Sequence, residues 1–345
     1  MLLNAPLLLV PVAVTLRFMD APPLLEFSVA VLALIPLALI LAATTESLSF
    51  HFNATVASLF NATAGNMIEL SIAFFAIQAV LIEVVKAAIT GSIIVNVLLL
   101  IGLAAFAGGF KYKVQIFNQK AAGVASSMLL VSIIGLAVPT LYGFTAKEPT
   151  EALSRTIAIA LGFIYLLSIV FTLFTHRTVF KAAELPLPGK QTLPVRMLVL
   201  ILVLTTVAVA IVSELLVHSM EPVASSLGFS STFIGLVVIA ILANVAEKVS
   251  AVTFALRNQM DLAFSIGMNS ATQVALFVAP MTVFMGWAMG QPMNLQFTTY
   301  EITALVASVL LVNHVASDGE VNWLEGAQLL TVYLIVVIAF YFLVN

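Results

Sequence analysis

The sequence predicts an all-α polytopic membrane protein. We expect eleven transmembrane helices, made of one extra N-terminal helix and two inverted five-helix repeats. Three observations support this fold class: a very apolar composition, a series of apolar segments about 20 residues long, and a set of polar residues that recurs at a constant offset along the chain.

The composition excludes several classes of protein. Of the 345 residues, 62% are apolar and 8% are charged, whereas soluble domains have about 45–50% and about 25%. The mean hydropathy is +1.17. These values argue against a soluble, a disordered or a nucleic-acid-binding protein. The chain has no Cys, which excludes a disulfide framework, a zinc–thiolate site and a cysteine nucleophile.

Apolar segments separated by Pro, Gly, Asn and charged residues predict the individual helices. The expected spans are 2–17, 26–45, 52–78, 82–109, 121–142, 152–175, 195–219, 230–256, 261–288, 296–315 and 325–344. The expected organisation is an extra helix in 1–22, a first repeat in 23–180 (helices 2–6), a linker in 181–196 and a second repeat in 197–345 (helices 7–11).

Basic residues near the ends of the spans predict the orientation, because cytoplasmic loops are enriched in Lys and Arg. One side has Lys111, Lys113, Lys120, Arg177, Lys181, Lys190, Arg196 and Arg257. The other has Arg17, Lys86, Lys147 and Arg155. We therefore expect a cytoplasmic N-terminus and a cytoplasmic linker.

An internal repeat relates the two halves of the chain. Gly65-Asn66-Met67-Ile68-Glu69 recurs as Ala243-Asn244-Val245-Ala246-Glu247, 178 residues later. The same offset relates Gly91-Ser92 to Asn269-Ser270, and Gly102, expected to break its helix, to Pro280. An odd number of spans in each repeat inverts the second copy. This is the architecture of secondary transporters, whose ion sites lie near the bilayer midplane.

The repeated segments contain the candidate site. Glu69 and Glu247 lie inside apolar helices, where an ionised carboxylate costs a few kcal/mol or more. Each follows an amide at i−3, on the same helix face. Matched hydroxyls and further amides complete the set: Asn66, Asn244, Ser92, Ser270, Asn96 and Gln273. An all-oxygen set suits a hard cation, Ca²⁺ foremost, with Glu69 and Glu247 as its metal ligands.

The same residues have other interpretations. A single Asn or Ser in a membrane helix more often joins neighbouring helices, but two Glu residues related by a repeat favour a cation site. A membrane-embedded hydrolase lacks support, because the chain has no H-E-x-x-H and no G-x-S-x-G. A passive channel would tend to build rings of like residues by oligomeric symmetry.

The sequence resembles the calcium/proton (cation/proton) antiporters of the Ca²⁺/cation antiporter superfamily. Gly65-Asn66-x-x-Glu69-Leu70 resembles the family motif G-N-x-x-E-L, and Asn244-Val245-Ala246-Glu247 is its second copy. Further segments occur in family order: 34–38 with Thr45-Glu46, 171–176, 213–217, 270–273 and 318–326.

The resemblance implies alternating access, with helices 2 and 7 sliding as gates against a core of helices 3, 4, 8 and 9. It implies that Glu69 and Glu247 carry the cation and the protons. It implies gating or coupling roles for Gln273 and, on the gate helices, for Glu46 and Glu214, although water-facing helix ends explain the last two nearly as well.

Exchange also follows from the charges. Two buried carboxylates are neutralised by one Ca²⁺ or by protons, and only a nearly neutral site can cross between conformations. The expected function is therefore Ca²⁺/H⁺ exchange by a secondary active transporter, with no catalytic residue, no enzymatic step and no cofactor. Inorganic cations, protons and lipid are the expected partners.

Lys248 departs from the family, which commonly has His at this position. Its place inside a span requires a partner, either a carboxylate or a carbonyl on a neighbouring helix. A permanently charged Lys beside Glu247 would weaken Ca²⁺ binding. A monovalent cation (Na⁺/K⁺)/proton antiporter is therefore the alternative, and a cation channel ranks third. The linker also lacks the acidic helix of many relatives, having only Glu184 as an acid.

Some features remain open at this point. Glu83 and Asp261 begin helices 4 and 9, as partners of the helix dipole or as funnel residues for cations. The segment 319–325 is expected to shape a turn. The short chain suggests a prokaryotic inner membrane, and a homo-oligomer is compatible with the sequence.

Overall fold

The computed structural model describes residues 8–19, 21–52, 60, 63–145, 151–175 and 193–344. Most of the predicted linker and the first part of the third predicted helix lie outside these residues. The chain divides into two compact units, one formed by 1–81 and 169–231 and the other by 82–168 and 232–345. Each unit therefore combines segments from both predicted repeats.

The described chain is a multi-pass, helical membrane protein. Seven helices are long and apolar enough to cross a membrane, and one bent pair of helices would make an eighth span. Three shorter apolar helices are also present, Leu9–Phe18, Met67–Gln78 and Thr299–Val315. Every predicted span overlaps a described helix, because an apolar segment in lipid must satisfy its backbone polar groups internally.

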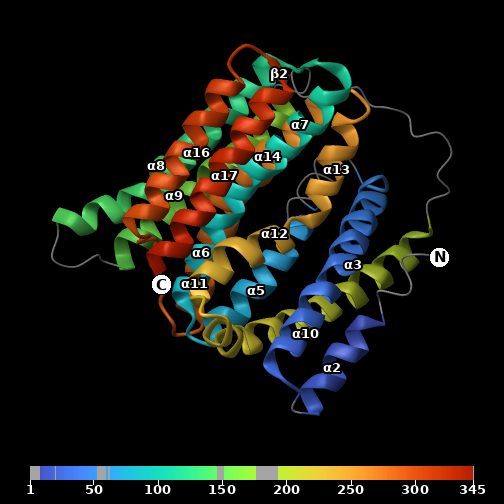
Figure 1. The fold of residues 1–345 in the computed structure, drawn as a ribbon, viewed down its shortest axis with the longest axis vertical. Coiled ribbons are helices and arrows are strands. Elements are labelled where there is room, and N and C mark those ends of the chain that lie inside the picture. Colours follow the sequence, from blue (N-terminus) through green and yellow to red (C-terminus); the bar gives the residue numbers. More distant parts are fainter. Residues whose placement is uncertain are drawn as a thin grey trace. The chain divides into compact units, whose positions relative to one another are not determined.

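The first unit is built around two long helices (Figure 1). Its elements are α2 (Leu9–Phe18), α3 (Pro23–Ser49), α5 (Met67–Gln78), η2 (Phe171–Thr175) and α10 (Val195–Leu227). Helix α10 packs along α3 and also contacts α2 and α5. A polar contact supports this packing: the Arg17 guanidinium lies 3.9 Å from the Glu26 carboxylate and 2.8 Å from Nε2 of His218.

Helix α10 is longer than the sequence predicts, since it continues past Pro222 and ends at Leu227. Pro222 removes one backbone hydrogen bond without ending the helix. The helix stops where Gly228 adopts a left-handed conformation, with φ of 69°, as is common just after a helix.

The second unit contains the remaining elements. In chain order these are α6 (Ile82–Ile94), η1 (Val95–Leu100), α7 (Ile101–Tyr112), β1 (Val114–Ile116), α8 (Gln119–Thr145), α9 (Glu151–Val170), α11 (Ser231–Ile234), η3 (Gly235–Ile239), α12 (Ala240–Ala243), α13 (Val245–Ala255), α14 (Met260–Gln273), η4 (Val274–Val278), α15 (Ala279–Ala288), α16 (Thr299–Val315), β2 (Glu320–Asn322) and α17 (Trp323–Val344).

Gly102 and Pro280 do not break their helices, contrary to the prediction. The segments Ile82–Tyr112 and Met260–Ala288 are each one continuous helix. Each contains a π-helical turn, η1 or η4, just before the Gly or Pro. Pro280 lies in the first turn of α15, where the widened turn leaves no hydrogen bond for the missing N–H to lose.

Two short strands were not predicted. Strands β1 and β2 pair antiparallel, with Gln115 opposite Val321. The buried Gln115 side chain donates to the Ala255 carbonyl (2.9 Å) and to Asn258 Oδ1 (3.0 Å). The segment around 320 therefore shapes the connection between α16 and α17, as expected, and also fastens it to the end of α13.

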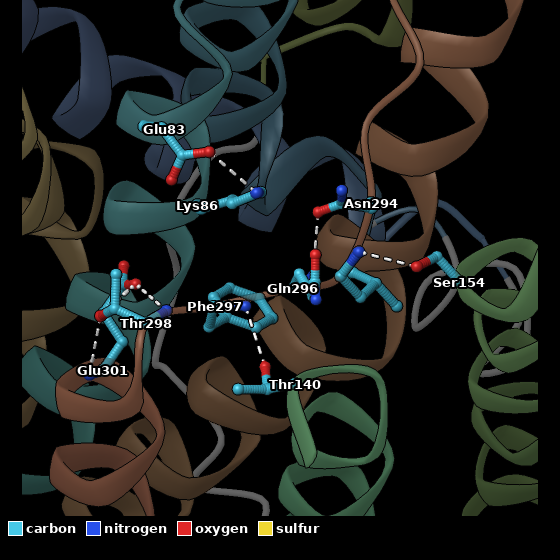
Figure 2. A network of polar contacts seen from close by, with 10 residues as sticks. Glu83, Lys86, Thr140, Ser154, Asn294, Gln296, Phe297, Thr298 and Glu301 are labelled. Carbon is cyan, nitrogen blue, oxygen red and sulfur yellow. Dashed lines mark hydrogen bonds and ion pairs between the residues drawn. The ribbon is translucent and has the colours of Figure 1, made fainter. Parts of the chain in front are cut away.

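The connection between α15 and α16 is non-helical (Figure 2), and three of its apolar residues, Met293, Leu295 and Phe297, are buried. Hydroxyl groups from two helices accept its backbone N–H groups: Ser154 Oγ from Leu295 (3.0 Å) and Thr140 Oγ1 from Phe297 (2.9 Å). Thr298 and Glu301 then form a capping box that begins α16. Hydrogen bonds to α8 and α9 and the capping box thus hold the backbone of this connection in place.

Candidate functional site

The second repeat motif lies at a break in a helix. Segments Ser231–Ala243 and Val245–Ala255 meet at an angle of 56°. Asn244 lies between them with φ of −115° and ψ of 29°, outside the helical region. Asn is well suited to such a position, because its short amide bonds to nearby backbone and competes with helical hydrogen bonds.

The first repeat motif has the same local backbone. Asn66 precedes α5 with φ of −96° and ψ of 17°. Residues 63–65 before it are helical. Both amides therefore interrupt a helix, as expected from the Asn and Gly residues around the two motifs.

Each break places a carboxylate at the start of a new helical segment. Glu69 lies in the first turn of α5, and Glu247 in the first turn of α13. Unpaired N–H groups and the positive end of the helix dipole favour a negative charge there. Glu69 is buried, with 8% exposure, and Glu247 is half-buried. Residues Asn66 and Glu69 belong to the first compact unit, and Asn244 and Glu247 to the second.

Four predicted site residues meet in the second unit. Asn96 Nδ2 donates to Ser270 Oγ (2.8 Å) and to Asn244 Oδ1 (3.2 Å). Ser270 Oγ donates to Asn244 Oδ1 (3.0 Å), and Asn244 Nδ2 donates to Ser92 Oγ (3.4 Å). We call these four residues the Asn244 network. Its members come from α6, η1, α14 and the break between α12 and α13, which pack together.

Asn96 donates to two other members of this network, although the sequence assigned it only a gating or coupling role. It is fully buried. Within the described part of the chain, its Oδ1 atom has no hydrogen-bond partner. Burying an amide oxygen without a hydrogen-bond donor costs free energy. Such an oxygen is a suitable ligand for a hard cation. Sequence spacing alone did not distinguish Asn96 from other membrane amides.

Lys248 is buried, with 7% exposure. Its ammonium donates to the Asn244 carbonyl (3.0 Å) and to the Ile241 carbonyl (3.2 Å). A carbonyl partner was one of the two expected, but these carbonyls belong to the broken helix itself and not to a neighbouring helix. The two acceptor carbonyls therefore lie at the break itself, within reach of the Lys248 side chain.

Two of the four described π-helical turns also follow the repeat. η1 occupies Val95–Leu100 and η4 occupies Val274–Val278. Shifting η1 by the 178-residue offset of the motifs places it at 273–278. π-Helical turns are rare and often occur at functional sites. Gln273 ends α14 directly before η4.

The other candidate residues lie elsewhere. Glu46 on α3 and Glu214 on α10 are exposed residues of the first unit. Glu83 lies in the first turn of α6 and forms an ion pair with Lys86 (2.9 Å). Asp261 lies in the first turn of α14, and its carboxylate accepts from the Asn118 backbone N–H. These two acids thus have partners typical of helix starts.

The oxygen ligands available for a cation are mainly neutral. Among the described residues, no group of three or more His, Cys, Asp or Glu side chains is arranged to hold a metal ion. A site made of few carboxylates and several amide, hydroxyl and backbone oxygens would bind a divalent ion moderately, since ligand charge raises affinity. Moderate binding suits an ion that must be released.

Comparison with known proteins identifies the family. The family described as sodium/calcium exchanger protein matches residues 23–174 and 197–342, which is most of the chain. The chain belongs to this family. The resemblance found in the sequence motifs is therefore confirmed.

Members of this exchanger family align along nearly the whole chain. A Ca²⁺/H⁺ antiporter of Aphanothece halophytica is 39% identical over 97% of this chain and 95% of its own. The Ca²⁺/H⁺ antiporter ChaA of Bacillus subtilis is 37% identical, with 97% of both chains covered. The solved structure of native YfkE has a TM-score of 0.83 at 35% identity, covering 96% of this chain and 97% of its own. The H⁺/Ca²⁺ exchanger CAX has a TM-score of 0.71 at 15% identity, covering 99% and 91%, and supports the fold.

Proposed function

We propose that this exchanger-family protein moves Ca²⁺ against H⁺ by alternating access, at a midplane site that pairs Glu69 with Glu247. The observation that carries this proposal is the repeated helix break, where an Asn interrupts the helix and a Glu follows in the first turn of the next segment. Relatives named Ca²⁺/H⁺ antiporters align over nearly the full chain and support the same activity.

The donor set supports Ca²⁺ as the substrate. Ca²⁺ takes six to eight oxygen ligands in flexible geometry. The proposed ligands are the two carboxylates, with side-chain oxygens of Asn66, Asn244, Ser92 and Ser270 near them. The Asn244 network supplies ordered amide and hydroxyl oxygens, and Asn96 Oδ1 lies buried beside them.

Competition for the two carboxylates explains exchange. One Ca²⁺ neutralises both, and two protons do the same. Either loaded site is nearly neutral and can change access, while an empty site with two buried negative charges is held back by its desolvation cost. Transport in one direction then requires the other ion to return, and no covalent step or nucleotide is needed.

The alternative function is exchange of a monovalent cation for protons. Lys248 favours it, because its charge lies beside the proposed site and would oppose a divalent ion more than a monovalent one. A passive channel ranks third. Gln273, Glu46 and Glu214 are proposed to couple or gate the movement, and the packing of α3 along α10 supports a role for these helices as a pair.

We further propose the complete membrane arrangement. Seven spans, one bent pair and three shorter helices are consistent with eleven crossings, and the recurring π-turns and helix breaks support two inverted repeats. The proposed setting is a prokaryotic inner membrane with a cytoplasmic N-terminus. Residues 181–196 would form the cytoplasmic linker between the repeats, with a homo-oligomer left open.

Proteoliposomes with an imposed pH step test the function. We expect saturable uptake of radiolabelled Ca²⁺ that collapses when a protonophore removes the pH gradient. Unlabelled Mn²⁺ and Na⁺ serve as competitors. Inhibition by Na⁺ together with pH-driven uptake of labelled Na⁺ would favour the monovalent exchanger, and Ca²⁺ uptake that does not respond to the pH step would contradict exchange.

A further inference from the structure

The end of α12 presents backbone carbonyls that a continuous helix would have used. The break at Asn244 interrupts the hydrogen-bond ladder, and a helix C-terminal end carries partial negative charge. In broken membrane helices, such ends are sites where transported cations bind. Ala240 O accepts from the Asn244 side chain (3.4 Å), so this carbonyl has a neutral donor.

The Lys248 side chain donates to two further carbonyls at the break, of which Asn244 O also accepts the Lys248 backbone N–H (3.3 Å). The Lys248 ammonium lies 3.2 Å from Ile241 O and 3.0 Å from Asn244 O. Both distances are those of ordinary hydrogen bonds. The same Asn244 residue accepts from Asn96 and Ser270 through its side chain. The ammonium therefore bonds directly to the backbone of Asn244, whose side chain belongs to the Asn244 network.

The chain contains two natural comparisons for this lysine. Leu70 takes the equivalent position after the first break, so the first repeat has no such cation. Among the described residues, Lys86 is the other buried lysine of the second unit, with 5% exposure, and it pairs with the carboxylate of Glu83 at 2.9 Å. Burial of a lysine in this unit is thus not tied to a helix break.

We propose that the ammonium of Lys248 acts as a tethered cation, which occupies the carbonyl end of α12 in place of an ion and lowers the affinity of the adjacent site for Ca²⁺. This inference rests on the proposed ion site. Lys248 is then a residue that determines ion affinity and preference without touching the transported ion. A weakened site would release Ca²⁺ more readily and would discriminate less strongly against monovalent ions.

The sign of the effect follows from electrostatics. A fixed positive charge a few ångströms from a divalent ion opposes its binding, and two carbonyls that already accept from an ammonium are poor ligands for a second cation. Charges this close in a site of intermediate dielectric interact strongly enough to change affinity by about tenfold or more. Removing the charge should therefore tighten Ca²⁺ binding.

Two neutral variants test this in the purified full-length protein. Lys248→Gln removes the charge and keeps a donor for the carbonyls, while Lys248→Met removes both. Equilibrium binding of radiolabelled Ca²⁺, with Na⁺ as competitor, is the readout. We expect Ca²⁺ to bind about tenfold or more tightly to both variants, and Na⁺ to compete less well. A gain in affinity is a result that damage to the fold would not produce.

Matched controls separate charge from structure. Lys248→Arg keeps the charge and should keep the wild-type affinity, and Lys86→Met removes a buried ammonium far along the chain from the break and should also leave affinity unchanged. If Lys248→Met fails to fold, Lys248→Gln decides. Wild-type Ca²⁺ affinity and Na⁺ competition in a folded Lys248→Gln protein would overturn the proposal.

The same preparation distinguishes this proposal from the proposed function. Wild-type protein that binds Ca²⁺ but shows no uptake driven by a pH step would contradict exchange, while the affinities of the Lys248 variants would still test the tethered cation. Conversely, normal exchange with unchanged affinity in Lys248→Gln would reject the tethered cation alone.

Discussion

The two helix breaks have nearly the same backbone but different chemistry. Asn66 and Asn244 both leave the helical region, and a Glu follows each in the first turn of the next helix. The residue after the Glu is Leu70 in one case and Lys248 in the other. The two breaks thus have similar backbone geometry, and they differ in the charge of the residue that follows the Glu. Variants at these positions test how much of the transport cycle each half supports.

Neutralising either carboxylate should have the largest effect. Glu69→Gln and Glu247→Gln each remove one of the two charges that Ca²⁺ and protons share, so we expect pH-driven Ca²⁺ uptake to fall to the background of empty liposomes. The control is Glu320→Gln, which changes an exposed Glu in β2 and should transport normally. Normal uptake by one of the two site variants would show that the halves are unequal in their carboxylates as well.

Placing a lysine at the first break should have the next largest effect. Leu70→Lys gives the first repeat the residue of the second, and the added positive charge should weaken Ca²⁺ binding by about tenfold or more. Binding of radiolabelled Ca²⁺ measures this, and Leu70→Met is the uncharged control. Unchanged affinity in a folded Leu70→Lys protein would mean that position 70 does not approach the ion site as closely as position 248.

The repeat-related serines should differ in a smaller and graded way. Ser270 Oγ accepts from Asn96 at 2.8 Å and donates to Asn244 at 3.0 Å, whereas Ser92 makes one long contact of 3.4 Å with Asn244. Ser270→Ala should cost about 1–3 kcal/mol of stability by leaving buried polar groups without partners. Ser92→Ala should cost less. Thermal unfolding in detergent compares them, and equal losses would contradict the ranking.

The smallest effect on Ca²⁺ binding is expected from the connection before α16, which belongs to neither break. Thr140→Val removes the acceptor of the buried Phe297 N–H, so it should lower stability by about 1–3 kcal/mol. Ca²⁺ affinity should stay at the wild-type value. Comparison of thermal unfolding with Ca²⁺ binding checks this, because loss of affinity without loss of stability would place the connection in the ion site.

Much of this fold is predictable from the sequence because a bilayer restricts the choices. A long apolar segment has to become a helix in lipid, and every predicted span overlaps a described helix. Asn66 and Asn244 were recognisable as interruptions because the same amide precedes a Glu at the same spacing in both halves. The exchanger family also followed from these motifs.

The features that sequence reasoning missed depend on contacts between distant segments. The pairing of β1 with β2 joins residues about 200 positions apart in the chain. Asn96 joins the network because its side chain meets Ser270 of α14 and Asn244 at the α12–α13 break. The Lys248 ammonium reaches two carbonyls of its own broken helix, Ile241 O and Asn244 O, and no composition or spacing rule contains that geometry.

The π-helical turn η1 allows one continuous helix to serve two interfaces that a regular helix would misalign. Before the turn, Ser92 belongs to the Asn244 network. After the turn, Gly102 and Gly109 allow α17 to approach closely. An added Cβ at Gly109 would lie 2.3 Å from the Trp323 backbone nitrogen. Each residue of an α-helix turns the chain by about 100°, so deleting one residue within Val95–Leu100 would rotate one interface away from its neighbour. The wide turn thus sets the rotation between the segment that carries Ser92 and the segment that carries Gly102 and Gly109.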